Sequence, residues 1–459
     1  MKPLWAIAKL TWKAAFRYRL FWALAALLLV AVVALPLLLR DDGTARGFIQ
    51  ILLTYNLSII TALLGLATLW LACGILARDI EDCQLQMIAV KPVSSWQIWL
   101  GKWLGIMMLN ALLLALAGGS VFLILKGRAK NLPPDQQAVL RNEIFTARAS
   151  VREPPPDLND MVNRVFRERL AQTPVPVEEQ AMLRQSLYEQ ARAGVEVVPP
   201  DFKRRWELNF GLRRHLVTDE PMYMRFKFHA AQTNLTGTYT GRFLIGPPGT
   251  ERVQSRMVEG LAPDAFHEFQ IPNNAFDEQG KLTIEFINWN DSALLFPIED
   301  GFEVLYREGG FGLNYVRGLL ILLSWLGFLA ALGLAAGSLL SFPVAAFCSL
   351  SLLVVALSSG TMASVVEEGT VTGLDHETGQ GGIAWLDAIM LPLFKAILAV
   401  VGLLEGYSPI DALSTGRSIT WAGLGVAWGQ IVLLLGGLLA VLGILTLSRR
   451  ELALPHARS

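Results

Sequence analysis

The stretch ARDIEDCQLQMIAVKPVSSWQIWLGKWLG, residues 77–105, separates two long apolar segments and sets the frame for the rest of the chain. It opens with a polar, mostly acidic run that ends at Lys91-Pro92. Proline disfavours helix at the residue before it, so this dipeptide predicts a corner. Ser94 followed three residues later by Gln97 has the form of a capping box and predicts a helix start. The pattern favours a helical leg leaving a membrane, a turn and a returning leg; the alternative is a plain solvated loop.

Composition places the chain among membrane proteins. Of its 459 residues, 53% are hydrophobic and 17% are charged, which is too apolar for an ordinary soluble chain. Several apolar runs reach the roughly 18 to 20 residues that cross a bilayer. The formal net charge is zero and no basic tail is present, so nothing indicates nucleic-acid binding.

Six segments are predicted to cross the membrane, at about 20–39, 48–76, 96–125, 313–340, 344–360 and 419–447. At 1.5 Å per residue the second is roughly 43 Å long, against a hydrocarbon core of about 30 Å. It must therefore tilt or project toward residues 77–105. Trp96, Trp99 and Trp103 lie on one side of the third segment, which predicts an interfacial aromatic belt. Phe342-Pro343 predicts a tight corner before the fifth segment.

Residues 1–18 predict a short helix before the first span. Four basic residues share an arc of about 80° on a helical wheel, bordered by aromatic residues. They are Lys2, Lys9, Lys13 and Arg17. A helix lying in the headgroup region has this pattern, and an ordinary basic flank that fixes topology has it equally.

The segment 385–405 is apolar but contains Asp387, Pro392 and Lys395. A full span with Lys395 near its centre is costly. We therefore predict two external half-helices that dip in from one side, with breaks at Pro392 and at 406–409. A seventh span is the alternative.

A large insert, residues 127–310, is predicted between the third and fourth spans. Its first part, 127–200, alternates proline-rich breaks with helix-like segments near 135–150, 157–172 and 177–193. From 201 to 310 apolar residues recur with a period of two, as at Trp206, Leu208 and Phe210, which predicts a small antiparallel β-sandwich.

The expected fold is therefore an α-helical polytopic membrane protein with six transmembrane helices, an N-terminal interfacial helix and an extracytoplasmic α+β insert. Its expected parts are residues 1–126, 127–310 and 311–459. The insert consists of a helical stalk and a β-sandwich.

The distribution of Lys and Arg predicts the orientation. With the N-terminus inside and six spans, these basic residues fall inside: Lys2, Lys9, Lys13, Arg17, Arg19, Arg78, Lys91, Lys102, Arg449, Arg450 and Arg458. The 361–418 segment falls outside, and its charged residues are mostly acidic, with only Lys395 and Arg417 basic. This is the expected bias, so both termini are predicted to be cytoplasmic and residues 127–310 extracytoplasmic.

The acidic-rich run after the second span, the Lys-Pro corner, the Ser pair and Gly101-Lys102 together resemble ABC-type exporter permeases of the second export class. Such subunits have six helices, and this stretch is the cytoplasmic element that docks onto the ATPase subunit. The resemblance implies that seven residues lie at or near that contact: Arg78, Asp79, Glu81, Asp82, Gln84, Lys91 and Pro92. It also implies a bacterial plasma (inner) membrane, contact with membrane lipid, and pairing with a second copy or a related permease. The family's usual Glu-rich run followed by Gly-Thr is replaced here by Cys83-Gln84-Leu85.

No chemistry for catalysis is evident in the sequence. There is no GxxxxGK[ST] phosphate loop, so ATP is expected to bind to a separate chain, and no cofactor is expected in this one. No nucleophile or acid–base set can be defended, so we do not expect an enzyme. Asp375-His376-Glu377 is more typical of a solvated loop than of a metal site.

Polar residues inside the spans are the remaining candidates. Asn56, Asn110 and Gln430 must find partners within protein or a wet cavity, because lipid offers none. Hydrogen bonds between helices are favoured over a substrate path. The spacings Gly333–Gly337 and Gly425–Gly429 permit close helix approach.

The leading hypothesis is a permease subunit of an ATP-driven exporter. The alternative is a membrane-anchored receptor or assembly factor that presents its β-sandwich outside. An intramembrane enzyme is the weakest hypothesis.

Overall fold

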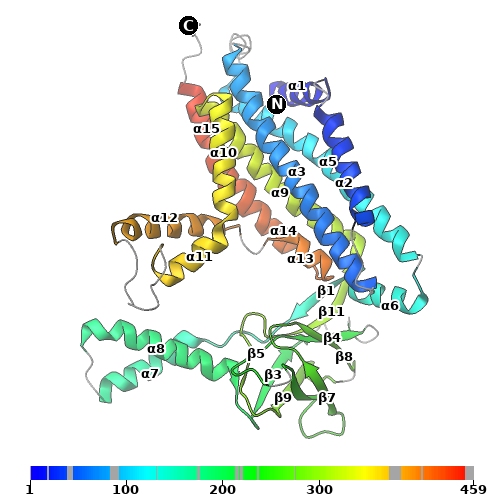
Figure 1. Cartoon of the computed structure of the whole chain (residues 1–459), viewed down its shortest axis with the longest axis vertical. Coiled ribbons are helices and arrows are strands. Elements are labelled where there is room, and N and C mark those ends of the chain that lie inside the picture. The colour runs from blue at the N-terminus through cyan, green and yellow to red at the C-terminus, as the bar shows by residue number, and fades with distance from the viewer. Residues whose placement is uncertain are drawn as a thin grey trace. The chain divides into compact units, whose positions relative to one another are not determined.

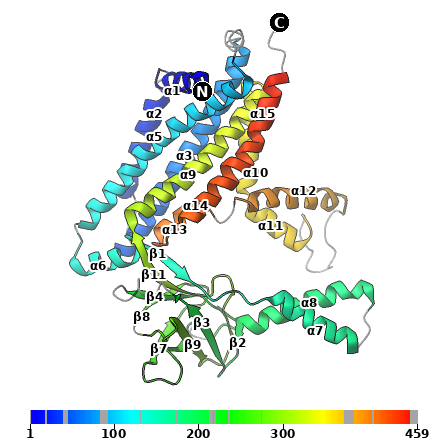
Figure 2. The same ribbon diagram turned by 180° about the vertical axis from the view of Figure 1, so that it is seen from behind.

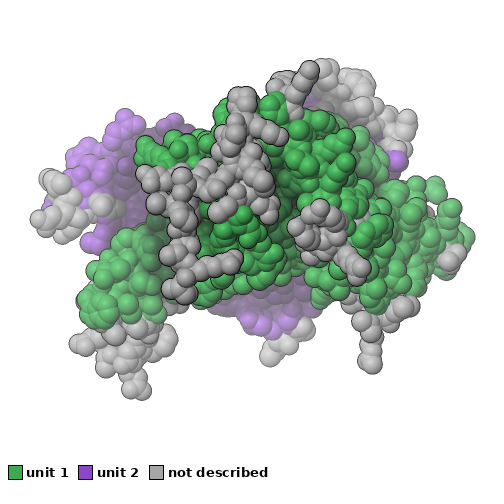
Figure 3. Space-filling model, turned by 90° about the horizontal axis from the view of Figure 1, so that it is seen from above, with its two compact units in different colours: residues 1–145, 310–459 green, residues 146–309 purple. Residues whose placement is uncertain are grey.

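The structure, a computed structural model, describes residues 2–17, 20–38, 45–82, 93–130, 132–172, 176–211, 217, 221–234, 237–273, 275–371, 384–404 and 407–449. The chain divides into two compact units, coloured separately in Figure 3. The first comprises Met1–Phe145 and Gly310–Ser459, and the second comprises Thr146–Gly309. The second unit thus begins at Thr146, whereas the insert was predicted to begin at 127.

The first unit is built of helices joined by short connections in its described residues. Its elements are α1 (Lys2–Arg17), α2 (Leu20–Leu38), α3 (Ala45–Glu81), α5 (Ser95–Lys130), α6 (Pro134–Glu143), α9 (Phe311–Leu339), α10 (Phe342–Leu357), α11 (Ser359–Glu368), α12 (Ala384–Gly402), α13 (Pro409–Ser414), α14 (Trp421–Ala427), the π-helix η2 (Trp428–Gly436) and α15 (Gly437–Arg449). Figures 1 and 2 show α2, α3, α5, α9, α10 and α15 side by side as a bundle, with α1 across one end. The predicted N-terminal helix is confirmed.

Several of these helices are suited to a membrane. Five are long and apolar enough to cross one: Ile49–Glu81, Ser95–Lys130, Phe311–Leu339, Trp385–Gly402 and Trp421–Arg449. The pair Phe342–Leu357 and Ser359–Val366 bends by 55° and gives a sixth when taken as one span. The predicted first span is apolar over the shorter stretch Trp22–Ala34. The described helices are therefore those of a membrane-spanning protein, and the number six stays a prediction.

Two helix ends differ from the prediction in ways that matter for the site. Helix α3 does not stop at residue 76 but continues to Glu81, so the start of the polar run is its last turn. Its 37 residues give a length of roughly 56 Å. The predicted corner at Phe342-Pro343 is confirmed, with the proline in the first turn of α10. The predicted fifth span ended at 360, whereas α10 ends at Leu357 and the chain bends into α11.

The predicted break at Pro392 is wrong. Helix α12 runs through Pro392 from Ala384 to Gly402. It packs against α11, so the observed pair of neighbouring helices is α11 and α12, and not two halves of residues 385–405. A proline inside a helix removes one backbone hydrogen bond, and here the helix nevertheless continues past it. The Asp387 carboxylate accepts a hydrogen bond from the backbone N–H of Val371 at 2.8 Å.

The second unit is α+β. Its elements are β1 (Thr146–Val151), α7 (Leu158–Gln172), α8 (Val177–Glu196), β2 (Val197–Val198), β3 (Lys203–Asn209), β4 (Met222–Phe226), β5 (His229–Ala230), β6 (Tyr239–Ile245), β7 (Gln254–Leu261), β8 (His267–Ile271), β9 (Lys281–Asn288), β10 (Leu294–Leu295) and β11 (Phe302–Gly310). The strands form sheets of order β1-β11-β4-β8, β3-β9-β6-β7 and β2-β10-β5. Helices α7 and α8 pack as a hairpin.

The two four-stranded sheets share one apolar core. Along β3, Trp206 and Leu208 are buried while Glu207 and Asn209 are exposed. The same alternation holds on β4, and inward residues of both sheets belong to one cluster. The predicted period of two is therefore confirmed on these strands.

The predicted helical stalk over 127–200 is only partly helical. The segment predicted as helical to residue 150 leaves the helix after Glu143, and β1 begins at Thr146. Strand β1 joins the sheet of β11, so the sandwich takes a strand from the part predicted to be a stalk.

Candidate functional site

The end of α3 carries the described part of the predicted coupling segment. Arg78, Asp79, Glu81 and Asp82 lie in or directly after its last turn. The other three predicted residues, Gln84, Lys91 and Pro92, lie outside the described residues.

The start of α5, which follows the coupling segment, makes the predicted capping interaction. The side-chain Oε1 of Gln97 accepts a hydrogen bond from the backbone N–H of Ser94 at 3.4 Å. This satisfies a backbone donor at the start of α5 and confirms that half of the capping box.

Asp79 is joined to α5 through Lys102. The Lys102 ammonium donates to the Asp79 carboxylate and to the Ile75 carbonyl, the latter at 3.4 Å. The Lys102 side chain is 5% exposed and that of Asp79 is 26% exposed. The buried Lys102 ammonium needs an oppositely charged partner, because removal of Asp79 would leave an uncompensated positive charge inside the protein. Asp79 is therefore part of a helix–helix contact.

Glu81 and Arg78 are joined to α10 through Phe342. The Glu81 Oε1 accepts a hydrogen bond from the backbone N–H of Phe342 at 3.0 Å. The Arg78 guanidinium lies 4.4 Å from the centre of the Phe342 ring. The Trp70 ring meets the same ring edge to face at 5.0 Å, and Gly74 leaves the space that this ring occupies.

Asp82 is exposed, as are Arg78 and Glu81, but unlike theirs its side chain has no partner among the described residues. Of the predicted acidic contacts, Asp79 and Glu81 thus have partners within the chain, whereas Asp82 has none among the described residues.

Sequence reasoning missed the two partners Lys102 and Phe342 as site residues. A lysine within an apolar helix entry is one signal for a buried ion pair. A Phe-Pro corner at the end of a span is a weaker signal, because its place beside α3 depends on the fold.

The predicted aromatic belt on α5 is wrong for two of its three tryptophans. Trp96 is exposed, but Trp99 is 1% exposed and Trp103 donates from its indole nitrogen to the Gly327 carbonyl at 2.9 Å. These two rings face other helices of the bundle. The face of α5 that carries Gly101 and Gly105 packs against α1.

The three polar span residues do not contact one another. The Asn56 amide donates to the Leu52 carbonyl of its own helix at 2.9 Å. Asn110 accepts from the Thr68 hydroxyl at 3.0 Å. Gln430, in η2, accepts from the Tyr407 hydroxyl at 2.6 Å. All three side chains therefore make hydrogen bonds within the chain. This agrees with the interpretation that the sequence favoured, hydrogen bonding between helices, over a path for substrate.

One glycine pair allows close packing within the chain. A side chain at Gly333 or Gly337 would meet the α3 backbone, at the Leu69 carbonyl (2.9 Å) and the Cys73 carbonyl (2.8 Å). The predicted close approach is thus confirmed for this pair, between α9 and α3. The pair Gly425 and Gly429 has no described atom within 4 Å of where a Cβ would lie.

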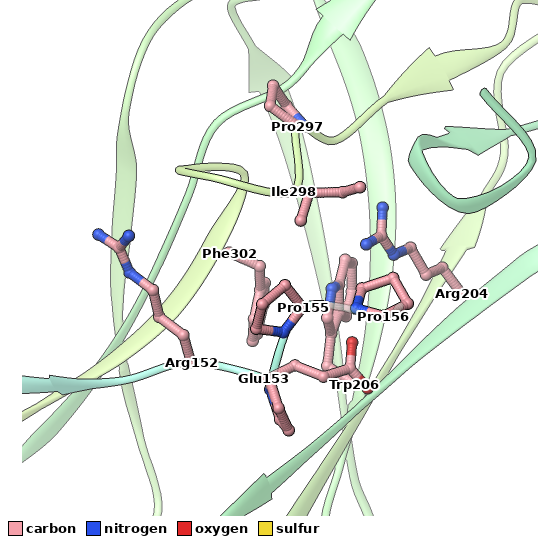
Figure 4. A pocket seen from close by; sticks show the side chains of 10 residues that line it. Arg152, Glu153, Pro155, Pro156, Arg204, Trp206, Pro297, Ile298 and Phe302 are labelled. Carbon is pink, nitrogen blue, oxygen red and sulfur yellow. The ribbon is translucent and has the colours of Figure 1, made fainter. Parts of the chain in front are cut away.

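The second unit contains a small hollow, shown in Figure 4. Arg152 and Arg204 lie on opposite sides of it, with Glu153 at one edge. Its cavity volume is about 20 Å³, room for about one water molecule. Trp206 forms part of the lining but is only 2% exposed. The hollow suits a bound water better than an organic ligand.

Glu153 gives this unit an expected pH dependence. Burial raises the pKa of its carboxyl above the ordinary 4.5, although the Glu207 N–H and the Arg204 guanidinium oppose the change. The folded state therefore binds the proton more tightly than the unfolded state, so stability falls as pH rises from 4.5 through the raised pKa. Glu153→Gln should remove this part of the slope and leave stability below pH 4.5 nearly unchanged. Hydrogen exchange of peptides from residues 146–309 between pH 4 and 8 measures it; an unchanged slope contradicts the assignment.

Neither metal ligands nor known relatives identify the chain. No group of three His, Cys, Asp or Glu that could hold a metal exists within the described ranges, and Asp375-His376-Glu377 lies outside them. Comparison with protein families, with curated proteins and with solved structures finds no match to this chain.

Proposed function

We propose that this chain is the permease subunit of an ATP-driven ABC exporter in a plasma membrane, paired with a second copy or a related permease. The observation that carries the proposal is the end of α3. A helix much longer than a bilayer is thick ends in a polar turn, directly followed by the exposed side chain of Asp82. The termini are then cytoplasmic and the second unit lies outside.

The mechanism follows from this placement. The chain has no phosphate loop, so an ATPase subunit supplies the energy by binding and hydrolysing ATP. Closure of the ATPases displaces residues 78–93, and α3 carries that displacement into the membrane. Coupling of this kind needs an element with two arrangements that nucleotide biases, and α3 with its neighbours is that element.

The docking prediction is tested by charge reversal at Asp82. Asp82→Lys should lower the affinity of the ATPase subunit for the chain roughly tenfold, because a like charge replaces an attractive one at the contact. Reversing Asp79 and Glu81 as well is less informative, since both have partners inside the chain. The matched control is Glu259→Lys, an exposed carboxylate on β7.

Affinity purification of the tagged full chain, followed by an ATPase assay of what is retained, measures the effect. Retention reduced by Asp82→Lys and unchanged by Glu259→Lys supports the proposal. If the unaltered chain retains no ATPase, the permease assignment is wrong. If Asp82→Lys retains as much ATPase as the unaltered chain, the docking assignment is wrong.

A further inference from the structure

We propose that Lys102 and Glu81 are positioning residues that join the end of α3 to α5 and α10, so that the three helices move as one body. The two contacts, Asp79–Lys102 and Glu81–Phe342, are called the α3 clamp. The inference rests on the proposed function for its purpose, since it states which helices receive the displacement of the coupling segment.

The α5 side of the clamp is a buried charge pair. Lys102 lies two turns into α5, and its ammonium contacts both Asp79 and the backbone carbonyl of Ile75. The two contacts fix the ammonium to one turn of α3. Because the Lys102 side chain is almost fully buried, α3 cannot slide past α5 without stripping this charge of its partners.

The α10 side of the clamp is a helix cap supplied by another helix. The first N–H groups of a helix have no partner within it and are usually satisfied by the N-cap side chain. The N-cap residue of α10, Ser341, makes no side-chain cap, and Pro343 has no N–H to satisfy. The Glu81 carboxylate accepts the Phe342 N–H instead, and its negative charge suits a helix N-terminus.

The Phe342 ring adds a second contact between the first turn of α10 and α3. It packs against Trp70 and Arg78, which lie on the same side of α3, and fills the space left by Gly74. The cap and the ring together attach the first turn of α10 to three successive turns of α3.

Helix α9 completes the arrangement. Its backbone packs directly on α3 at Gly333 and Gly337, and it leads into α10 through the corner at Ser341. The end of α3 is thus fixed to α5 on one side and to α9 and α10 on another. A displacement of residues 78–82 is delivered to the starts of α5 and α10 as well as to α3.

Hydrogen exchange of the full chain, with whatever ATPase is retained, tests the clamp. Glu81→Ala should speed exchange at the first amides of α10, residues 342–349, roughly tenfold, because a cap of this kind is lost. Glu81→Gln keeps an acceptor oxygen and should restore most of the protection. Lys102→Met should speed exchange at residues 95–105 by a similar or larger factor, and Lys102→Arg should do so less. Lys130→Met, an exposed lysine on the same helix, is the matched control.

The change in hydrogen exchange on addition of MgATP separates a role in coupling from a purely structural one. In the unaltered complex, exchange should change together in residues 73–82, 95–105 and 342–349. Glu81→Ala should reduce the change in 342–349 alone, because only the ring contacts of Phe342 then remain, and Lys102→Met should reduce it in 95–105 alone. A response of 342–349 that is undiminished in Glu81→Ala overturns the proposal.

The failure of the clamp and the failure of the proposed function are distinguishable. If the unaltered chain retains no ATPase and shows no response to MgATP, the permease assignment fails, while the exchange rates without nucleotide still test the clamp. If those rates are the same in Glu81→Ala and in the unaltered chain, the clamp is wrong whatever the ATPase result.

Discussion

Replacing Trp206 by alanine is expected to destabilise the second unit by about 3–5 kcal/mol, the usual cost of removing a large aromatic side chain from a core. The Trp206 ring is 2% exposed and stacks on Phe302 with centroids 4.1 Å apart. It also meets Phe296 edge to face at 5.3 Å, and the Arg204 guanidinium lies 5.0 Å from its centre. A cavity at this position removes contacts to both four-stranded sheets, because Trp206 is on β3 and Phe302 on β11.

The matched control for this prediction is Trp289→Ala. Trp289 is 52% exposed and has the Arg242 guanidinium 5.7 Å from its ring. Its removal should cost less than about 1 kcal/mol, in the range of surface substitutions and an exposed cation–π contact. Hydrogen exchange of peptides from β3, β9 and β11 in the full chain compares the two. Equal effects of the two substitutions would show that the shared core between the sheets is wrongly assigned.

The sandwich strands could be predicted because their signal is local. On β3 and β4 the alternation of apolar and polar residues directly encodes which side faces the core, and no partner strand is needed to recognise it. Strand β1 has the sequence TARASV, whose small and polar residues give no alternation. It becomes a strand because β11, far along the chain, offers an edge to pair with, and no local pattern carries that information.

The same distinction applies to the candidate site. The contact between Ser94 and Gln97 spans three residues and was predicted from their spacing. The contacts of Lys102 with Asp79 and of Phe342 with Glu81 span 23 and 261 residues, so they depend on how the helices pack. The sequence singled out the acidic residues of the segment as a group, but it could not separate Asp79 and Glu81, which contact other helices, from Asp82.

The tryptophans of α5 show how packing overrides a surface pattern. An aromatic run at a helix entry is typical of a membrane interface. Here small residues on neighbouring helices make room for two of the rings: the Trp99 indole lies where a side chain at Gly443 would be, and Trp103 bonds the backbone at Gly327. Glycines on the other helices decide the orientation of these rings, and they are visible only once the helices are paired.

Gly105→Ala is expected to weaken the attachment of α1 to the bundle by about 1–3 kcal/mol, the cost of overpacking a close contact. A Cβ at residue 105 would lie 2.6 Å from the Thr11 Cβ and 2.9 Å from the Ala8 carbonyl oxygen. The second is a backbone atom, so a rotamer change cannot relieve the clash and α1 as a whole must move.

The control lies on the same helix and should act in the opposite direction. Gly119 has no described atom within 4 Å of where its Cβ would lie, so Gly119→Ala should stabilise α5 by about 0.5–1 kcal/mol through helix propensity alone. Hydrogen exchange of residues 4–16 measures the attachment of α1. If exchange of these residues is faster with Gly105→Ala and unchanged with Gly119→Ala, α1 is held by its contact with α5. Its exposed Trp5 and Leu10, the side chains suited to lipid, then supply only part of the attachment. Unchanged exchange in both would mean that lipid alone holds α1.

Residues 101–105, which contact α1, also include Lys102 of the α3 clamp, so a displaced α1 should weaken the contact between α3 and α5 as well.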